Sequence, residues 1–408
     1  MYKHRYFATL NPKAGNLLTL FDKKEHGKRR RLLGPSFNED RVRNFQSNMA
    51  RHTRLFLDLL GTSAHTTASD DDWLPAQNMT KWCDYLIFDL LIEFLLGFQC
   101  NMLTSTEWRS IIDDMEAASV RNAVRICTPA LMIWRMDKLL FPDSVRGTRK
   151  FWNWVKHVMD VRAKRDLTDD AYSCLLRTGL PEETIRSELG LLITAGLDTT
   201  TSALAAMFFY LSRNEAVYDK VVNEIRSAFA QEDDTLRMSP PIGSCPIRAV
   251  GEGGDVVDGH FIPEGTMIGT GLYSLHHNET NFPNPDTFMP ERWLVVDNDN
   301  GDGSSPVTAA GAHDKTTGCR PHVFLAGARA CIGQGLALSE IQFIMARCIW
   351  RYDFRAAPGP NRQVGAGSQP RPGDQRAQGR HNPDEFQLLD RITSLKDGPV
   401  IQFRQRRR

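Results

Sequence analysis

Apolar residues recur at helical spacing along much of the chain. Residues 41–60 and 79–98 place leucine, isoleucine and phenylalanine three or four positions apart, which predicts helices with at least one buried face. Residues 105–165 continue this pattern, with breaks at Pro129 and Pro142. The first half of the chain is therefore predicted to be helical.

A further long helix is predicted to open at Pro181, since proline suits the first turn and the two glutamates after it suit the positive end of the helix dipole. Its apolar run contains Gly196, which costs about 1 kcal/mol against alanine, and Asp198, which is costly to bury without a partner or a task. Three threonines follow and can distort the helix. A kinked helix with a satisfied aspartate is one interpretation, and a functional acid is the other.

Strand-like alternation appears in residues 247–275, where Asp258-Gly259 is typical of a hairpin turn. A closing hairpin is predicted over 392–403, with its turn at Lys396-Asp397-Gly398. The pattern as a whole predicts a mainly α fold with a minor β-region.

Two segments lack the composition of a packed core. Residues 297–317 are rich in Asp, Gly, Ser, Thr and Ala, and residues 356–383 are rich in Gly, Pro, Gln and Arg. We expect both to be disordered insertions within one domain that spans residues 1–408.

Composition excludes several classes of protein. The chain has 50 Lys+Arg against 49 Asp+Glu, so no global field recruits nucleic acid. The eight cysteines are scattered singly without a C-x-x-C pair, which favours free thiols over zinc or a disulfide framework. The N-terminus is polar, and the apolar run over 85–98 is interrupted by Asp89 and Glu93 and is too short to span a membrane.

The most informative stretch is F-x-x-G-x-R-x-C-x-G, in which the five fixed positions are Phe324, Gly327, Arg329, Cys331 and Gly333. A cysteine just before a helix start lies near unpaired backbone N–H groups and the positive end of the dipole, which favours thiolate. The glycines allow close approach to a flat group, and an arginine suits a carboxylate. A haem-thiolate site is one interpretation, and a buried structural cysteine is the other.

This stretch resembles the haem-binding loop of the cytochrome P-450 superfamily, with Leu325 and Ala328 departing from its usual pattern. The resemblance implies that Cys331 is the axial ligand of the iron of haem b, and that Phe324, Gly327, Arg329 and Gly333 surround it.

The helix opened by Pro181 carries a second resemblance, to the oxygen-activation motif of the same superfamily. It implies that Ala195 and Gly196 leave room for dioxygen, and that Asp198 and Thr199 deliver protons.

Near the N-terminus, His26 and Arg30 match a W/H-x-x-x-R element that contacts a haem propionate in the family. The other lysines and arginines of residues 22–37 are expected to be solvated or to dock an acidic redox partner. The resemblance begins close to the start of the chain, so we expect a P-450 fold without its N-terminal anchor and part of the N-terminal sheet.

The family's buried E-x-x-R charge cluster is altered in this chain. The residue three before Arg237 is Asp234, whose side chain is shorter than glutamate by one C–C bond, roughly 1.5 Å. Arg292, in a P-E-R-W element, would complete the cluster, and the segment before Arg237 is shorter than the family needs. Two outcomes stay open: a cluster that persists, or a chain that fails to load haem.

The resemblance implies a haem-thiolate monooxygenase that inserts one oxygen atom of O2 into a lipophilic substrate of fungal secondary metabolism. An NADPH-cytochrome reductase would supply electrons to a monomer on the cytoplasmic side, peripheral to the endoplasmic reticulum membrane. The alternatives are a haem-thiolate isomerase or dehydratase, and a truncated haem-binding or haemless remnant.

Overall fold

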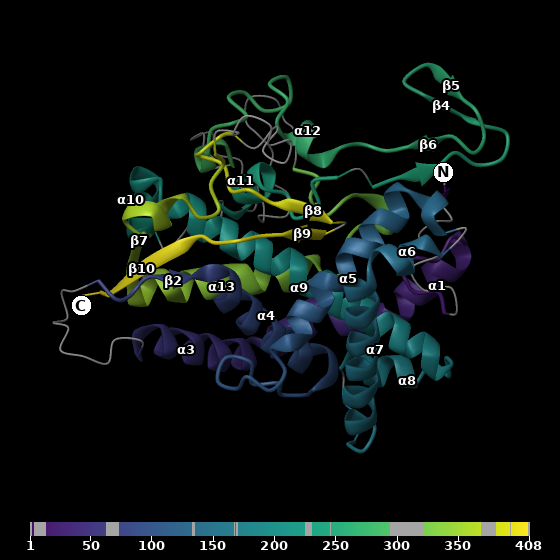
Figure 1. Ribbon diagram of the computed structural model, residues 1–408, viewed down its shortest axis with the longest axis horizontal. Coiled ribbons are helices and arrows are strands. Elements are labelled where there is room, and N and C mark those ends of the chain that lie inside the picture. The colour runs from purple at the N-terminus through teal and green to yellow at the C-terminus, as the bar shows by residue number, and fades with distance from the viewer. Residues whose placement is uncertain are drawn as a thin grey trace, which may run out of the picture.

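The computed structural model in Figure 1 describes most of the 408 residues. The described residues are 2–3, 14–62, 73–132, 135–166, 168, 170–224, 231–244, 246–293, 321–368, 381–391 and 393–406. The predicted insertion over 297–317 lies outside them.

Helices dominate the described chain, as the apolar spacing predicts. The α-helices are α1 (Lys23–Leu33), α2 (Glu39–Asn44), α3 (Gln46–Thr62), α4 (Met79–Leu96), α5 (Ser110–Cys127), α6 (Met136–Leu140), α7 (Pro142–Arg162), α8 (Ala171–Leu176), α9 (Glu182–Leu211), α10 (Glu215–Glu224), α11 (Gln231–Met238), α12 (Leu272–His276) and α13 (Gln334–Arg351). Short 3-10 helices are η2 (Gly34–Phe37), η3 (Pro129–Met132), η4 (Pro290–Trp293), η6 (Gly327–Arg329) and η7 (Gly359–Gln363).

The strands are short and form small antiparallel sheets beside the helices. They are β1 (Tyr2–Lys3), β2 (Gln77–Asn78), β3 (Arg248–Ala249), β4 (Asp255–Val257), β5 (His260–Ile262), β6 (Met267–Ile268), β7 (Tyr352–Ala356), β8 (Leu389–Arg391), β9 (Thr393–Leu395) and β10 (Val400–Gln405). The sheet orders are β1-β3-β6, β2-β10-β7, β4-β5 and β8-β9. Ile401 of β10 lies opposite both Gln77 and Ala356. The predicted fold class, mainly α with a minor β-region, is confirmed.

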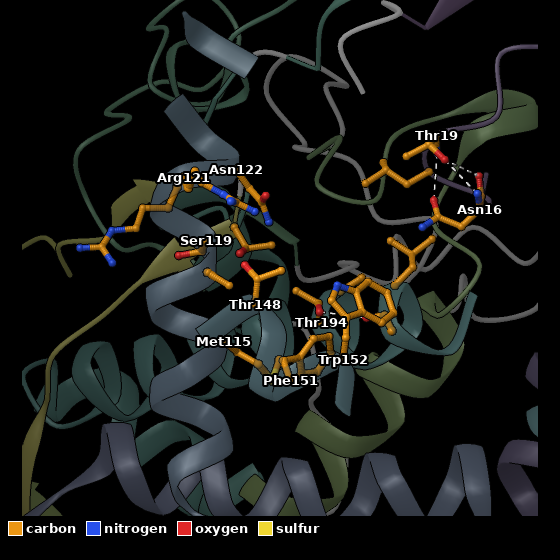
Figure 2. A pocket seen from close by; sticks show the side chains of 17 residues that line it. Asn16, Thr19, Met115, Ser119, Arg121, Asn122, Thr148, Phe151, Trp152 and Thr194 are labelled. Carbon is orange, nitrogen blue, oxygen red and sulfur yellow. Dashed lines mark hydrogen bonds between the residues drawn. The ribbon is translucent and has the colours of Figure 1, made fainter. Parts of the chain in front are cut away.

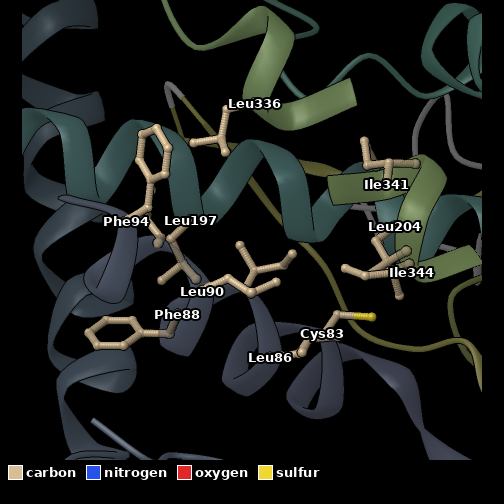
Figure 3. Close-up of a cluster of buried hydrophobic side chains, with 14 of the residues drawn as sticks. Cys83, Leu86, Phe88, Leu90, Phe94, Leu197, Leu204, Leu336, Ile341 and Ile344 are labelled. Carbon is tan, nitrogen blue, oxygen red and sulfur yellow. The ribbon is translucent and has the colours of Figure 1, made fainter. Parts of the chain in front are cut away.

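The long helix α9 runs through the middle of the molecule and contacts α4, α7, α11 and α13 (Figure 1). Figure 3 shows Leu90 of α4, Leu197 and Leu204 of α9 and Ile344 of α13 in the same apolar cluster, and all four are buried. By length and composition α9 could cross a membrane, but 67% of its most apolar window is buried inside the protein. We therefore assign α9 as the core helix against which the site is built.

Local sequence signals set the ends of α4, which packs against α9. The Asn78 side chain accepts a hydrogen bond from the Thr80 backbone N–H at 2.9 Å, and so satisfies one of the free donors of the first turn. The helix ends at Gly97, whose φ of +58° is a left-handed conformation that glycine adopts without strain.

The β-region differs from the sequence prediction in three places. The hairpin turn at Asp258-Gly259 joins β4 and β5 as predicted, but the strand pattern stops at Ile268 and α12 begins at Leu272. The predicted closing hairpin over 392–403 is wrong, because β9 pairs with β8 while β10 pairs with β2 and β7. Within 356–383, the described part contains η7 and a bridge between Ala366 and Phe386, where we expected no regular structure.

Candidate functional site

Cys331 lies on a tight loop between η6 and the start of α13. The Cys331 backbone N–H donates to the Phe324 carbonyl oxygen at 2.9 Å and closes the loop. Leu325 and Gly327 have φ of +58° and +72°. Only the glycine adopts this left-handed conformation without cost, so Leu325 introduces local strain. Gly333 caps α13, and the loop presents the sulfur just before a helix N-terminus, as predicted.

Opposing influences act on the Cys331 thiol. Burial raises its pKa, while the backbone N–H groups of Gly333 and Gln334 and the positive charge of Arg30 act in the opposite direction. The donors of the helix start thus favour thiolate as predicted, but desolvation outweighs them and the net pKa is raised. A bound cation at the sulfur would reverse the balance and deprotonate it.

The Cys331 sulfur opens onto a cavity between its loop and α9, which we call the cysteine cavity. Its empty volume, including its open mouth, is about 1150 Å³. Ala195, Gly196 and Thr199 of α9 line one wall, and Phe324 and Cys331 line the other. The remaining lining residues are mostly apolar: Phe37, Leu91, Leu192, Thr200, Ala203, Leu236, Pro241, Ile242, Val323, Leu325, Arg329, Ile332, Gly333, Leu336, Ala337, Glu340 and Ile341.

The residues of the cysteine cavity fit haem. The cavity is apolar, as the faces of a porphyrin require, and it has one soft sulfur ligand on its wall together with a small-residue stretch of helix opposite. Cys331, Ala195, Gly196, Thr199 and Phe324 are thus brought together. Glu340, which the sequence analysis missed, is buried without a hydrogen-bond partner on its Oε1 among the described residues. Burial raises its pKa to about 8.

Three basic side chains surround the cysteine loop from α1 and η6. Arg329 lines the cysteine cavity and donates to the carbonyl oxygens of Leu20 and Phe21 at 2.9 and 3.1 Å. Arg30 donates to the Ala330 carbonyl oxygen at 2.6 Å. His26 is buried on α1, and His26 and Arg30 border a neighbouring hollow rather than the cysteine cavity. The bond to Ala330 uses one of the five N–H groups of Arg30, so the guanidinium keeps donors for a propionate.

The predicted oxygen-activation residues lie in the middle of α9. The Thr199 hydroxyl donates to the Ala195 carbonyl oxygen at 2.7 Å. A side chain at Gly196 would place its Cβ 2.9 Å from the Leu91 methyl groups of α4. Gly196 therefore permits close packing of α4 against α9, a physical reason for this glycine that the sequence analysis did not identify.

Asp198 points away from Thr199 into a polar network that includes the last strands of the chain. Its carboxylate accepts a hydrogen bond from the Thr393 hydroxyl at 2.7 Å. Burial raises its pKa to about 6, while Thr393 and the charge of Lys396 pull it down. Lys396 in turn donates to Asp84 at 2.7 Å and to Thr201 at 2.8 Å.

Lys396 was predicted to lie in a turn, and Thr393 and Asp84 were not identified from the sequence. The Lys396 side chain is only 7% exposed, because its ion pair with Asp84 draws it inward. The sequence signal that could have indicated this ion pair is Asp84, an acid within the apolar run of α4.

The altered charge cluster is assembled despite the shorter acid. Asp234 Oδ1 lies 2.7 Å from Arg237 Nε and 3.2 Å from Arg292 Nε, and Asp234 Oδ2 accepts the Met289 backbone N–H. Arg237 also donates to the carbonyl oxygens of His276, Pro285 and Thr287. We call Asp234, Arg237 and Arg292 the α11 cluster. The shorter acid thus still assembles the cluster, which removes the physical reason to expect failure of haem loading at this position.

A second cavity lies on the other side of Ala195, which lines both, and we call it the α5 cavity (Figure 2). Its empty volume, including its opening, is about 970 Å³. It is enclosed by side chains of α5, α7 and α9 and by residues near both ends of the chain. They are Asn16, Leu18, Thr19, Met115, Ala118, Ser119, Arg121, Asn122, Thr148, Phe151, Trp152, Gly190, Leu191, Thr194, Ala195, Arg391 and Thr393.

Comparison with known proteins supports one family throughout. The family model described as Cytochrome P450 matches residues 2–365. A cytochrome P450 monooxygenase of Gibberella zeae is 34% identical over 99% of this chain and 95% of its own, and monooxygenase poxM of Penicillium oxalicum is 33% identical over 99% and 77%. The crystal structure of a cytochrome P450DA heme domain covers 100% of this chain and 84% of its own, with a TM-score of 0.72 and 16% identity.

Proposed function

Since this chain belongs to the cytochrome P450 family of haem-dependent monooxygenases, we propose that it inserts one oxygen atom of O2 into a lipophilic compound of fungal secondary metabolism. The observation that carries the proposal is the position of Cys331, which lines the same apolar cavity as Thr199 and Ala195. The fungal relatives support a natural-product substrate by analogy.

Haem b is the cofactor of the family, and we propose a separate role in its binding for each of several residues of this chain. Cys331 is proposed as the axial ligand, Phe324 and Gly333 as the surroundings of the sulfur, Gly327 as the turn that shapes the loop, and Arg329 as a partner of a propionate. Haem bound in this way supplies the redox chemistry that activates dioxygen. The assembled α11 cluster supports haem loading and counts against a haemless remnant.

Proton delivery is proposed for Asp198 and Thr199. Asp198 has a pKa of about 6, so it can gain and lose a proton near neutral pH. Its hydrogen-bond partner Thr393 lines the α5 cavity, and its helix neighbour Thr199 lines the cysteine cavity. Retention of both groups favours monooxygenation over the isomerase and dehydratase alternatives, which need no protons for oxygen activation.

Electrons are proposed to come from an NADPH-cytochrome reductase that docks on α1. Lys24, Lys28 and Arg31 are exposed on this helix, while Arg30 contacts the cysteine loop through the Ala330 carbonyl oxygen. A basic surface next to the cysteine loop suits an acidic partner and favours rapid encounter.

Peripheral attachment to the endoplasmic reticulum membrane from its cytoplasmic side is proposed from exposed apolar side chains. Leu139 of α6 is 73% exposed, and Phe261 and Val256 of the β4–β5 hairpin are 65% and 63% exposed. Both elements lie at the same end of the molecule as the N-terminus in Figure 1. Exposed apolar groups of this size favour an interface with lipid.

The ferrous carbon monoxide spectrum of the purified protein tests the proposed function. Thiolate ligation should give the red-shifted band of the family, and Cys331→Ala should abolish it. A spectrum typical of histidine ligation would overturn the proposal. Thr199→Ala should keep the band while lowering the product formed per NADPH; unchanged coupling would remove Thr199 from the proton relay.

A further inference from the structure

The α5 cavity combines an apolar floor with a polar wall that contains a cation. Met115, Phe151, Trp152 and Ala195 contribute apolar surface, and Figure 2 shows Ser119, Arg121 and Asn122 along the α5 side, opposite Asn16 and Thr19. Asn16 and Thr19 hydrogen-bond each other, so the α5 side is where a ligand can find donors.

Arg121 is buried at 6% exposure and makes no hydrogen bond to another described residue. Its Nε lies 3.9 Å from Asp137 Oδ2, beyond hydrogen-bond distance, and the Nε is without a hydrogen-bond partner. The pKa of Arg121 is lowered by burial, which the charge of Asp137 offsets only in part. A buried guanidinium in this state bears a desolvation cost that a bound anion would relieve.

A second buried arginine lies near the acid that faces Arg121. Arg125 Nε is 4.0 Å from the same Asp137 oxygen. We call Arg121, Arg125 and Asp137 the α5 cluster. The other acids of α5 are engaged elsewhere: Asp113 and Glu116 with Lys81, and Asp114 with Lys150.

We propose that Arg121 binds the carboxylate of an amphiphilic organic acid, which is the substrate class of the proposed monooxygenase, and the inference rests on that function. The planar guanidinium fork can bind both oxygens of a carboxylate. Asn122 also lines the α5 cavity, and its side-chain amide can donate a further hydrogen bond.

The apolar body of such an acid has a defined path toward the site of oxidation. Trp152 packs directly over Gly190 of α9, since a Cβ at Gly190 would lie 2.5 Å from the indole ring. The indole lines the same cavity as Arg121, and Ala195 lines both this cavity and the cysteine cavity. The acid group is held remote from Cys331, so the oxidised carbon lies away from the carboxylate.

Isothermal titration calorimetry on the haem-loaded protein at pH 7.5 tests this assignment, with straight-chain acids of eight to sixteen carbons and the alcohols of equal length as probes. A charge-assisted hydrogen bond predicts that the best acid binds about 10- to 100-fold more tightly than its alcohol. Arg121→Gln should remove that ratio without changing alcohol affinity. Lys150→Gln, which removes an exposed charge from α7, should leave the ratio unchanged.

Asp137→Asn is a second variant, and it should change the ratio of acid to alcohol affinity in the opposite direction. It removes the carboxylate that competes for Arg121, so the organic acid should be preferred more strongly over its alcohol. Equal binding of acid and alcohol by the wild type, or an acid preference that survives Arg121→Gln, would overturn the proposal. Absence of acid binding in a protein with the red-shifted carbon monoxide band would overturn the substrate class and leave the monooxygenase function standing. Loss of that band itself would instead count against the function.

Discussion

The α11 cluster and the α5 cluster each contain two buried arginines and one buried aspartate, but they differ in how far their hydrogen bonds are satisfied. In the α11 cluster, Arg237 is 0% exposed and donates to Asp234 and to three carbonyl oxygens. In the α5 cluster, Asp137 lies 3.9 and 4.0 Å from the two arginines.

The difference separates structural from ligand-binding use of the same residue types. An arginine that donates to a carboxylate and to three carbonyl oxygens, as Arg237 does, fixes the backbone around it and has little capacity for a ligand. A cluster with a buried donor left over carries a desolvation cost, and a ligand of opposite charge recovers that cost. Composition alone cannot distinguish a structural cluster from a ligand-binding one. The hydrogen bonds from Arg237 to three carbonyl oxygens identify the α11 cluster as structural.

The largest expected effect is on the α11 cluster. Arg237→Gln removes four hydrogen bonds and leaves buried carbonyl oxygens and the Asp234 carboxylate without their donor. We expect a loss of about 3–5 kcal/mol in the free energy of unfolding and a fall in haem content. Urea unfolding followed by tryptophan fluorescence and the haem absorbance measure both; a loss below about 1 kcal/mol would contradict the structural assignment of this cluster.

The α11 cluster also shows how much of the site sequence could predict. The spacing from Phe324 to Gly333, the Pro181 helix start and the Asp234–Arg237 pair are local patterns, in which a few neighbouring residues determine both geometry and chemistry. The structure places them as that spacing implies. Whether aspartate could replace glutamate depended on how closely Met289 and Arg292 approach, and one side-chain length cannot decide that.

The parts that sequence could not predict depend on partners distant along the chain. Lys396 pairs with Asp84 across 312 positions, and that pair explains the buried lysine. The strand pattern of residues 393–395 is consistent with pairing on either side, and β8 is the partner that the tertiary structure selects. Arg121 belongs to an amphipathic helix in which arginine is ordinarily exposed, so nothing local indicated its burial.

Asp198 sharpens the comparison, because it is a buried acid with a single strong hydrogen bond. Its pKa of about 6 is above the ordinary 3.8, so the folded state holds the proton more tightly than the unfolded state. The associated stability is present below pH 3.8 and is lost as the pH rises through 6. Asp198→Asn should therefore be more stable than the wild type by up to about 3 kcal/mol at pH 8.

The pH dependence of that gain provides the control for Asp198→Asn. Urea unfolding of variant and wild type at pH 5 and pH 8 should show a gain that grows by about 1 kcal/mol or more between them. A gain that is constant with pH would mean that the substitution acts through packing and not through the charge.

A smaller effect is expected when the acid of the α11 cluster is lengthened. Asp234 is fully buried with its oxygens engaged, so Asp234→Glu inserts a methylene into a packed site. We expect a loss of about 1–3 kcal/mol. The shorter side chain alone would suggest the reverse, that glutamate restores a defective cluster. Haem retention during gel filtration decides between them, and improved retention would show that the cluster is under-packed.

The smallest effect on stability is expected at Arg121, where the substitution matches that at Arg237. Arg121→Gln breaks no hydrogen bond between described residues, and Asp137 keeps Arg125 as its neighbour, so no buried charge is orphaned. The free energy of unfolding should change by less than about 1 kcal/mol. Two buried arginines with the same chemistry would then differ several-fold in their contribution to stability. If Arg121→Gln lowered the free energy of unfolding as much as Arg237→Gln, the α5 cluster would also be structural. The distinction between the two clusters would then fail.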